Sequence, residues 1–159
     1  DNSILLELDS TFCKVHACSA LKEQAIGSSR GGKNTKILVL LNERMQLLKV
    51  ILTGGQIHDS EPALALLNGI KLKGKKILAD KAYSSEQIRF FIAEHGAFAC
   101  IPDKANFKHD FDSELYKQRN IVERFFQRIK NYRHVATRFD KLALCFENFV
   151  LLASSVIHL

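Results

Sequence analysis

Hydrophobic runs that end in polar residues alternate along this chain with stretches of helical periodicity. Five of the runs are rich in aliphatic or β-branched side chains, and we predict a strand at each: residues 4–12, 35–41, 47–53, 76–80 and 97–101. A loop of about five residues separates the second run from the third, so these two strands should form a hairpin.

Four further stretches predict helices: residues 61–67, 86–95, 116–130 and 142–159. The last stretch is almost continuously apolar, which is typical of a buried helix. Residues 17–26 could form one more short helix, followed by a loop at 27–33. Three strands followed by helices that alternate with two more strands favour an α/β fold, with a five-stranded mixed sheet and helices on both faces.

The stretch 116–130 has the clearest pattern, because its apolar residues recur at helical spacing and no Gly or Pro interrupts it. Beside the apolar stripe, four polar residues fall within an arc of roughly 60° around the helix axis: Tyr116, Arg119, Glu123 and Lys130. A carboxylate in such a stripe can hold a divalent metal, and the cations beside it can hold phosphate. The alternative is a solvated helix face with one Arg119–Glu123 ion pair.

Two aspartates, Asp9 and Asp80, lie at the carboxyl ends of predicted strands. If these strands are neighbours, their ends meet at the edge where open α/β sheets bind ligands, and the helix with Glu123 must pack on the same sheet. We expect the three carboxylates to converge even without metal. Clustered acids repel one another, and this repulsion favours the binding of divalent cations. Two such ions about 3.5–4 Å apart can clamp the attacking and leaving oxygens of a phosphoryl transfer. The alternative for each aspartate is a turn-forming role.

Composition and charge narrow the function classes. A chain of 159 residues with 47% hydrophobic and 25% charged residues suits a single globular domain, and a net charge of +6 favours a polyanionic partner. No apolar run is long enough to cross a membrane. The four cysteines form no metal-binding pattern, so we expect reduced thiols in a cytoplasmic protein, with a Cys13–Cys18 disulfide as the alternative. The glycine-rich segment at 27–33 lacks the spacing of a phosphate-binding P-loop.

The spacing Y-x2-R-x3-E-x6-K, from Tyr116 to Lys130, resembles the signature helix of DDE transposases of the insertion-sequence four and five group. Six segments of the chain are similar to conserved stretches of that family: residues 8–11, 30–36, 53–59, 78–83, 119–130 and 133–141. The order of predicted elements is likewise that of the ribonuclease H-like fold. The resemblance therefore covers most of the chain.

The resemblance implies a catalytic domain that spans residues 1–159 and carries out DNA transposition. Asp9, Asp80 and Glu123 would be the catalytic residues and would hold two Mg²⁺ ions, for which Mn²⁺ can substitute. Arg119 and Lys130 would contact phosphate near the cut, with Tyr116 as their neighbour in the DNA-binding site. The implied reaction is hydrolysis of phosphodiesters at the element ends, followed by attack of the freed 3′-hydroxyl on target DNA. The implied partners are double-stranded DNA and a second copy of the chain in the DNA complex.

Several other polar residues carry weaker signals. Five basic residues with few acids near them predict a stripe that binds the DNA backbone, or else a simple solvated surface: Arg124, Arg128, Arg133, Arg138 and Lys141. His58 and Asp59 could add a metal contact, although a polar loop after the third strand is the simpler interpretation. For Tyr83 we expect packing rather than chemistry.

The chain departs from the family pattern in two ways. Members usually carry a helical DNA-binding region before the first aspartate, whereas only eight residues precede Asp9, so we expect that region to be absent. Some members also have a large β-rich insertion before the glutamate helix, for which the segment 102–116 is too short. Two other functions stay open: a ribonuclease H-like nuclease that cuts without joining, and a DNA-binding remnant without catalysis.

Overall fold

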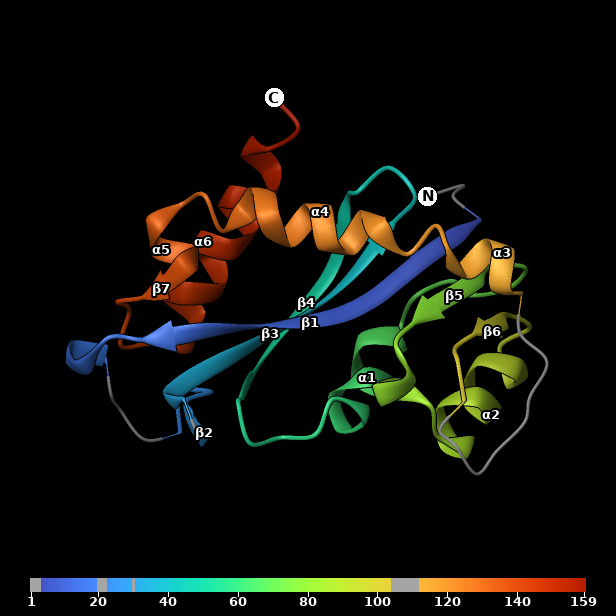
Figure 1. The fold of residues 1–159 in the computed structure, drawn as a ribbon, viewed down its shortest axis with the longest axis horizontal. Helices are drawn as coiled ribbons and strands as arrows, with labels where there is room; N and C mark the ends of the chain where they lie inside the picture. Colours follow the sequence, from blue (N-terminus) through green and yellow to red (C-terminus); the bar gives the residue numbers. More distant parts are fainter. Residues whose placement is uncertain (1–3, 20–22, 30, 104–111) are drawn as a thin grey trace.

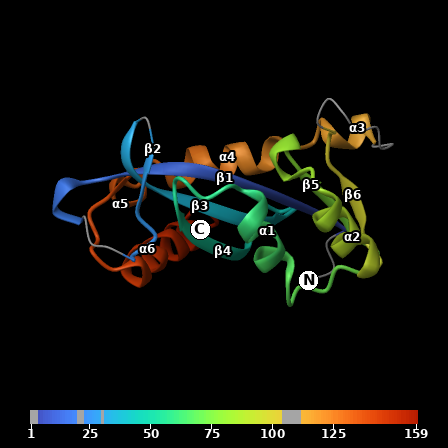
Figure 2. The same ribbon diagram turned by 90° about the horizontal axis from the view of Figure 1, so that it is seen from below.

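The computed structural model describes residues 4–19, 23–29, 31–103 and 112–159, and it forms one sheet with helices on both faces (Figures 1 and 2). Seven strands pair in the described part. They are β1 (Leu5–Val15), β2 (Gly27–Ser29), β3 (Gly32–Asn42), β4 (Leu47–Gly54), β5 (Lys76–Ala79), β6 (Phe98–Cys100) and β7 (Thr137–Arg138).

β1 is the central strand of this sheet. It runs antiparallel to β3 on one side and parallel to β5 on the other, and β6 extends the sheet beyond β5. β4 pairs antiparallel with β3, which confirms the predicted hairpin. β1 pairs with β5 as far as Leu8 and Ala79, so Asp9, which lies within β1, and Asp80, which follows β5, are next to one another. The prediction that these two strands are neighbours is confirmed. The prediction that Asp9 lies near the end of its strand is wrong, because β1 continues to Val15 and pairs there with β3 and β7.

Hydrophobic side chains fill both faces of the sheet because β1 and β3 alternate between them. Leu6 and Leu8 of β1 pack with helices α1 (Ser60–Leu67) and α2 (Glu86–Glu94) on one face. On the other face, β3 residues Ile37 and Val39 pack with α4 (Asn120–Ile129) and α6 (Ala143–Val156). The prediction of helices on both faces is confirmed, and it positions α4 directly above β1.

The predicted number of strands was wrong, because β2 and β7 were not foreseen. β2 lies inside the predicted loop 27–33 and pairs with the start of β3, while β7 pairs with the end of β1. These strands contain three and two residues, too few to produce an alternating pattern. Of the predicted helix at 17–26, the structure shows only the short 3-10 helix η1 (Ala17–Ser19), and residues 20–22 lie outside the described part.

The predicted helix 116–130 is interrupted. A short helix α3 (Ser113–Tyr116) ends before Lys117, and α4 begins at Asn120 after a turn in which the Arg119 amide donates to the Tyr116 carbonyl. Tyr116 thus lies on a different helix from Glu123, although its ring remains 5.7 Å from the Arg119 guanidinium. Arg119, at the interruption, and the first turn of α4 both make tertiary contacts with β1.

The C-terminal helix was expected to be buried all round and is not. α6 buries Phe146, Val150 and Ala153, whereas Leu144 and Leu152 are 67% and 59% exposed. Two shorter elements complete the description: the 3-10 helix η2 (Lys81–Tyr83) and the helix α5 (Arg133–Ala136). None of the described helices is long and apolar enough to cross a membrane.

Candidate active site

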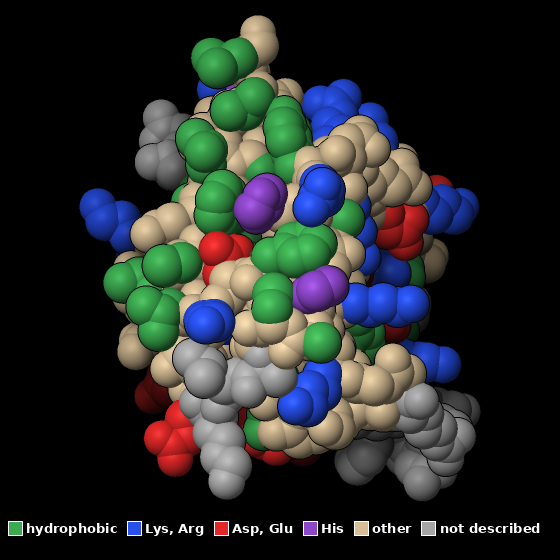
Figure 3. Space-filling model, turned by 90° about the vertical axis from the view of Figure 1, so that its left-hand side faces the viewer, with side chains coloured by type: hydrophobic (Ala, Val, Ile, Leu, Met, Phe, Trp, Pro, Cys, Tyr) green, Lys and Arg blue, Asp and Glu red, His purple; other side chains and the backbone are tan. Residues whose placement is uncertain are grey.

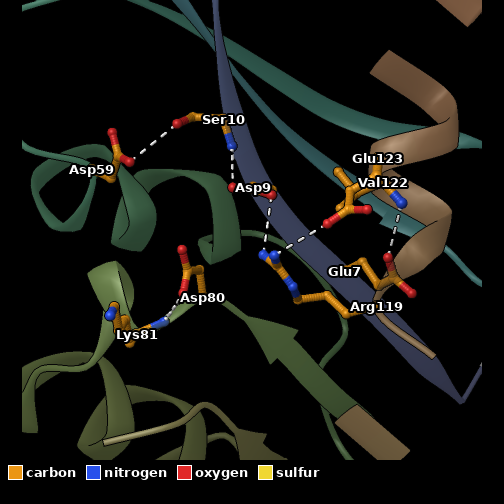
Figure 4. Close-up of polar contacts among 9 residues, drawn as sticks. All are labelled: Glu7, Asp9, Ser10, Asp59, Asp80, Lys81, Arg119, Val122 and Glu123. Atoms are coloured by element: carbon orange, nitrogen blue, oxygen red, sulfur yellow. Dashed lines mark hydrogen bonds and ion pairs between the residues drawn. The ribbon is translucent and has the colours of Figure 1, made fainter. Parts of the chain in front are cut away.

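One side of β1 faces α4 with a row of polar side chains, at alternate positions along the strand. Glu7 accepts a hydrogen bond from the Val122 backbone amide, Asp9 is paired with Arg119, and Thr11 accepts a hydrogen bond from Lys130 (Figure 4 for the first two contacts). The partners lie at the start and at the end of α4. α4 is therefore joined to β1 by polar contacts at both of its ends, in addition to its apolar packing.

Arg119 lies between two of the three candidate carboxylates (Figure 4). One guanidinium nitrogen is 3.1 Å from Asp9 Oδ2, and another is 3.4 Å from Glu123 Oε1. The side chains of Arg119 and Asp9 are mostly buried, whereas that of Glu123 is 60% exposed. The expected Arg119–Glu123 pair exists, and through it the tertiary fold connects Glu123 to Asp9.

Asp80 approaches the same space from the end of β5 (Figure 4). Its carboxylate accepts a hydrogen bond from the Lys81 amide, while the Asp9 carboxylate accepts one from the Ser10 amide. Burial raises the pKa of Asp9, the negative charges of Asp80 and Asp59 raise it further, and the Ser10 amide and Arg119 lower it. The site thus concentrates negative charge around Asp9, which favours a bound cation.

The donor set suits a hard divalent cation, because all three candidates supply carboxylate oxygens. Among the described residues, however, no three carboxylate, histidine or cysteine side chains come close enough together to hold a metal ion as they stand. The expectation that the triad converges on a shared metal pair without metal is therefore not met. The physical reason is visible in Figure 4: the Arg119 guanidinium already occupies the space between Asp9 and Glu123 and neutralises part of their charge.

Glu7 is a functional candidate that the sequence analysis missed. Its side chain is 0% exposed, and Oε2 lies 2.9 Å from the Val122 nitrogen, while Oε1 has no hydrogen-bond partner in the part of the chain that the structure describes. Burial raises the pKa of Glu7 to about 7, against the lowering effects of the Val122 amide, Arg119 and Arg124. The sequence did contain a signal for Glu7. An acidic residue inside the hydrophobic run 4–8 is unfavourable in a buried strand unless its carboxyl group has a hydrogen-bonding or ionic partner.

Asp59 forms a second polar cluster on the opposite side of β1. It pairs with the buried Lys36 of β3 and accepts a hydrogen bond from Ser10 Oγ at 3.1 Å. His58 instead hydrogen-bonds locally with Ser60, at the start of α1. Tyr83 is fully buried, as its predicted packing role requires, and burial together with the nearby Asp59 and Asp9 charges raises the pKa of its phenol. This cluster holds the backbone at Ser10, next to Asp9, from the face of the sheet opposite to α4.

The basic residues divide into exposed and buried ones. Arg124, Arg128 and Arg133 are exposed, and the end of the molecule with α5, α6 and β7 shows Lys and Arg side chains beside hydrophobic ones (Figure 3). Arg138, in contrast, is 0% exposed and donates hydrogen bonds to the carbonyls of Gln24, Asp140 and Lys141 and to the hydroxyl of Thr35.

The prediction that Arg138 belongs to a DNA-binding stripe is therefore wrong. Its guanidinium is enclosed by backbone oxygens, and it packs over the Phe146 ring at 5.3 Å. An arginine whose donors are already occupied inside the protein cannot reach a phosphate. The four cysteines are free thiols, so the alternative of a Cys13–Cys18 disulfide is also wrong.

Comparison with known proteins gives three findings. Residues 3–110 match a family described as transposase DDE domain, and residues 77–159 match a second family with the same description. A Brucella ovis protein, named for transposase activity in the insertion sequence element IS6501, is 37% identical over 116 residues, which are 70% of this chain and 88% of that protein. The piggyBac transposase, solved by cryo-electron microscopy as a synaptic complex with hairpin DNA, has 13% identity and a TM-score of 0.45. The similarity covers 70% of this chain, which spans about a quarter (25%) of the piggyBac chain.

Proposed function

Because this chain belongs to the DDE transposase family, we propose that Asp9, Asp80 and Glu123 form the centre with which it cuts and joins DNA during transposition of an insertion sequence. One observation supports this assignment above the others. Asp9 of β1 lies beside Asp80, which follows the neighbouring strand β5, and Arg119 connects Glu123 to Asp9, although the three residues are far apart in the sequence. A solvated helix face would not require such an arrangement.

We further propose that the fold is ribonuclease H-like. Four pairings join five of the strands in the order β4-β3-β1-β5-β6, with β3 antiparallel to β4 and β1 and with β1, β5 and β6 parallel. Helices α1 and α2 cover one face and α4 and α6 the other. Five strands in this order form the central sheet, and β2 and β7 are short additions at its margins.

Family membership implies dependence on a divalent metal, and we propose Mg²⁺, with Mn²⁺ as a substitute. Asp9, Asp80 and Glu123 would hold the metal, which when bound supplies Lewis-acid activation of a phosphodiester. The residues of this chain do the remaining work. Arg119 stabilises Asp9 and Glu123 as carboxylates, and it can exchange these partners for a phosphate oxygen when DNA arrives, because guanidinium binds both groups in the same fork geometry.

Lys130 and the exposed arginines would bind the DNA backbone. Lys130 Nζ lies 2.6 Å from Thr11 Oγ1, on the same side of β1 as Asp9, so its charge faces the proposed catalytic edge. Tyr116 packs beside Arg119 and limits how that side chain can move. Arg124, Arg128 and Arg133 continue the positive surface along and beyond α4. These contacts would position double-stranded DNA without reading its bases.

We also propose that two copies act together on DNA, one for each end of the element. The support for this step is family membership alone. Light scattering on the complex with an end-sequence duplex should give the mass of two chains, whereas a mass of one chain on every duplex would contradict the proposal.

The central test is a cleavage and strand-transfer assay with Mg²⁺ or Mn²⁺. Asp9→Asn, Asp80→Asn and Glu123→Gln should each abolish cleavage, and Glu123→Gln should bind DNA equally well or more tightly because a negative charge that faces phosphate is removed. Glu114→Gln is the matched control, since Glu114 is exposed on α3 and its carboxylate pairs locally with Lys117. Wild-type cleavage by Glu123→Gln would refute the assignment.

The same assay separates the alternatives. A nuclease would produce cut ends that never join to target DNA, and a remnant would bind DNA without cutting it at any metal concentration. Joined products that contain the element end at a new target site are the result we expect.

A further inference from the structure

We infer that Glu7 is a positioning residue, which fixes the start of α4 on β1 so that Glu123 and Arg119 face Asp9. The inference rests on the proposed function, because it concerns the geometry of the proposed metal ligands. It is carried by the contact between the Glu7 carboxyl and the Val122 amide, which joins two segments 115 residues apart in the sequence.

The first turn of any helix exposes backbone amides that need acceptors from elsewhere. In α4 the preceding residue, Arg119, provides no side-chain cap. Glu7 provides the acceptor instead, since its Oε2 is 2.9 Å from the nitrogen of Val122, the third residue of the helix. This is the task of an N-cap side chain, but here it is performed by a residue of the central strand, so it fixes the helix relative to the sheet.

The location of this contact relates it to the site. Glu7 precedes Asp9 by two residues and therefore projects from the same side of β1, roughly 7 Å away along the strand. Val122 immediately precedes Glu123. The hydrogen bond thus joins a side chain two residues before Asp9 to the backbone amide immediately before Glu123, and the Arg119 contacts connect the two proposed ligands themselves (Figure 4).

Apolar packing alone does not account for a glutamate here. Glu7 is aligned with Leu41 of β3 and Leu78 of β5, both completely buried, and a leucine would suit those surroundings. Burial of a carboxyl group costs free energy that only specific partners offset. Among the described residues, the second carboxyl oxygen has no hydrogen-bond partner, and the bond to the Val122 amide is the contact that the group makes. What the carboxyl adds is a directional link to α4, which hydrophobic contact cannot provide.

The test uses two substitutions with opposite effects on that link. Glu7→Gln keeps an acceptor oxygen at the same reach, whereas Glu7→Leu keeps the volume and removes the acceptor. Mn²⁺ binding is measured by calorimetry on the full chain with a duplex present, and cleavage is measured as a function of Mn²⁺ concentration. Ile92→Val, in the core on the other face of the sheet, controls for loss of stability.

We expect Glu7→Leu to weaken Mn²⁺ binding by about 10–100-fold, the usual range for residues that orient metal ligands. Saturating Mn²⁺ should restore much of its cleavage rate, because the ligands are present but misplaced. Glu7→Gln and Ile92→Val should bind Mn²⁺ as the wild type does. Amide exchange at Val122 should be faster in Glu7→Leu alone, a readout independent of metal. If Glu7→Leu does not fold, Glu7→Met replaces it.

Three outcomes would overturn the inference. Folded Glu7→Leu could bind Mn²⁺ like the wild type, or Glu7→Gln could lose as much affinity as Glu7→Leu, and either result removes the role of the hydrogen bond while leaving the proposed function intact. If the wild type itself binds no Mn²⁺ and cuts no DNA, the proposed function fails and the inference fails with it.

Discussion

Arg119, which precedes α4 in the chain, and Arg138, which follows it, have different roles in this protein. Arg119 bridges two carboxylates at a partly open edge, where a phosphate or a metal can compete for its partners. Arg138 is completely enclosed and gives its donors to backbone carbonyls and one hydroxyl. Burial lowers the pKa of Arg138, yet an arginine remains charged under all ordinary conditions. Arg119 is therefore available for function, whereas Arg138 stabilises the fold.

This contrast leads to a prediction about stability. Arg138→Ala should lower the free energy of unfolding by more than about 2 kcal/mol, because it leaves several buried carbonyls without donors. Arg133→Ala, which removes an exposed arginine five residues earlier, should change stability by no more than about 0.5 kcal/mol and should weaken DNA binding. Urea denaturation of both variants is the measurement. Equal stabilities would show that the enclosed network contributes nothing.

The cysteines give a second prediction for single residues. Burial raises the pKa of Cys13 to about 11 and also raises that of Cys100, so both thiols should resist alkylation in the native protein. At pH 8 only about 0.1% of Cys13 would be thiolate. Cys18 and Cys145 are exposed and should react quickly. Mass spectrometry after a short treatment with iodoacetamide should show two labels, and four after denaturation. Rapid labelling of Cys13 in the native state would contradict its burial.

Among the helices, α4 and α6 show how surroundings modify a sequence pattern. α4 has a clean amphipathic stripe, and all five of its apolar positions are buried. α6 is apolar nearly all round, but the sheet can cover only one of its sides, and Leu144, Leu152 and Val156 stay exposed. These side chains contribute to the hydrophobic area at the end of the molecule seen in Figure 3.

A pair of substitutions on α6 tests this description. Phe146→Ala should destabilise the protein by about 3–5 kcal/mol, because it opens a cavity in the core beneath the helix. Leu144→Ala lies two residues earlier on the exposed side and should change stability by only about 0.5 kcal/mol. Thermal unfolding followed by circular dichroism gives both values. Similar losses for the two variants would mean that α6 is covered on both sides in solution.

Across the whole molecule, the exposed basic side chains are distributed unevenly around the proposed catalytic edge. The net charge is +6, and the exposed arginines of α4 and α5 lie on the face of the sheet that also carries Asp9. Lys71 and Lys73 are exposed as well, but they precede β5 and so lie at the opposite end of that strand from Asp80. Position rather than total charge should therefore determine which residues bind DNA.

The salt dependence of DNA binding measures which of these basic residues contact phosphate. Affinity of the 159-residue chain for duplex DNA should be modest, on the order of 10⁻⁴–10⁻⁶ M at physiological salt, and should fall steeply as salt rises. Arg124→Ala and Arg128→Ala should each reduce the slope of log affinity against log salt by about 0.9, the value for one lost phosphate contact. Lys71→Ala and Lys73→Ala should leave the slope unchanged. Fluorescence anisotropy at several salt concentrations gives these slopes. Equal effects of all four variants would mean that total charge, rather than the position of each basic residue, determines DNA binding.

Much of this organisation could be predicted from the sequence because it depends on local spacing. The alternation and length of the hydrophobic runs report which side chains avoid water, and that was enough to locate the hairpin, the strand end at Asp80 and the core face of α4. The Arg119–Glu123 pair follows from a separation of four residues on one helix. Each of these features involves residues close together in the chain.

The rest was decided by contacts between distant segments, which leave no periodic trace in the sequence. The capping of α4 by Glu7 and the pairing of β7 with β1 both depend on backbone groups whose partners are far away in the sequence. The burial of Arg138 has the same origin, since its acceptors come from both ends of the chain. Hydrophobic patterning states that a side chain prefers the interior, but only the folded chain determines which polar groups meet there and satisfy one another.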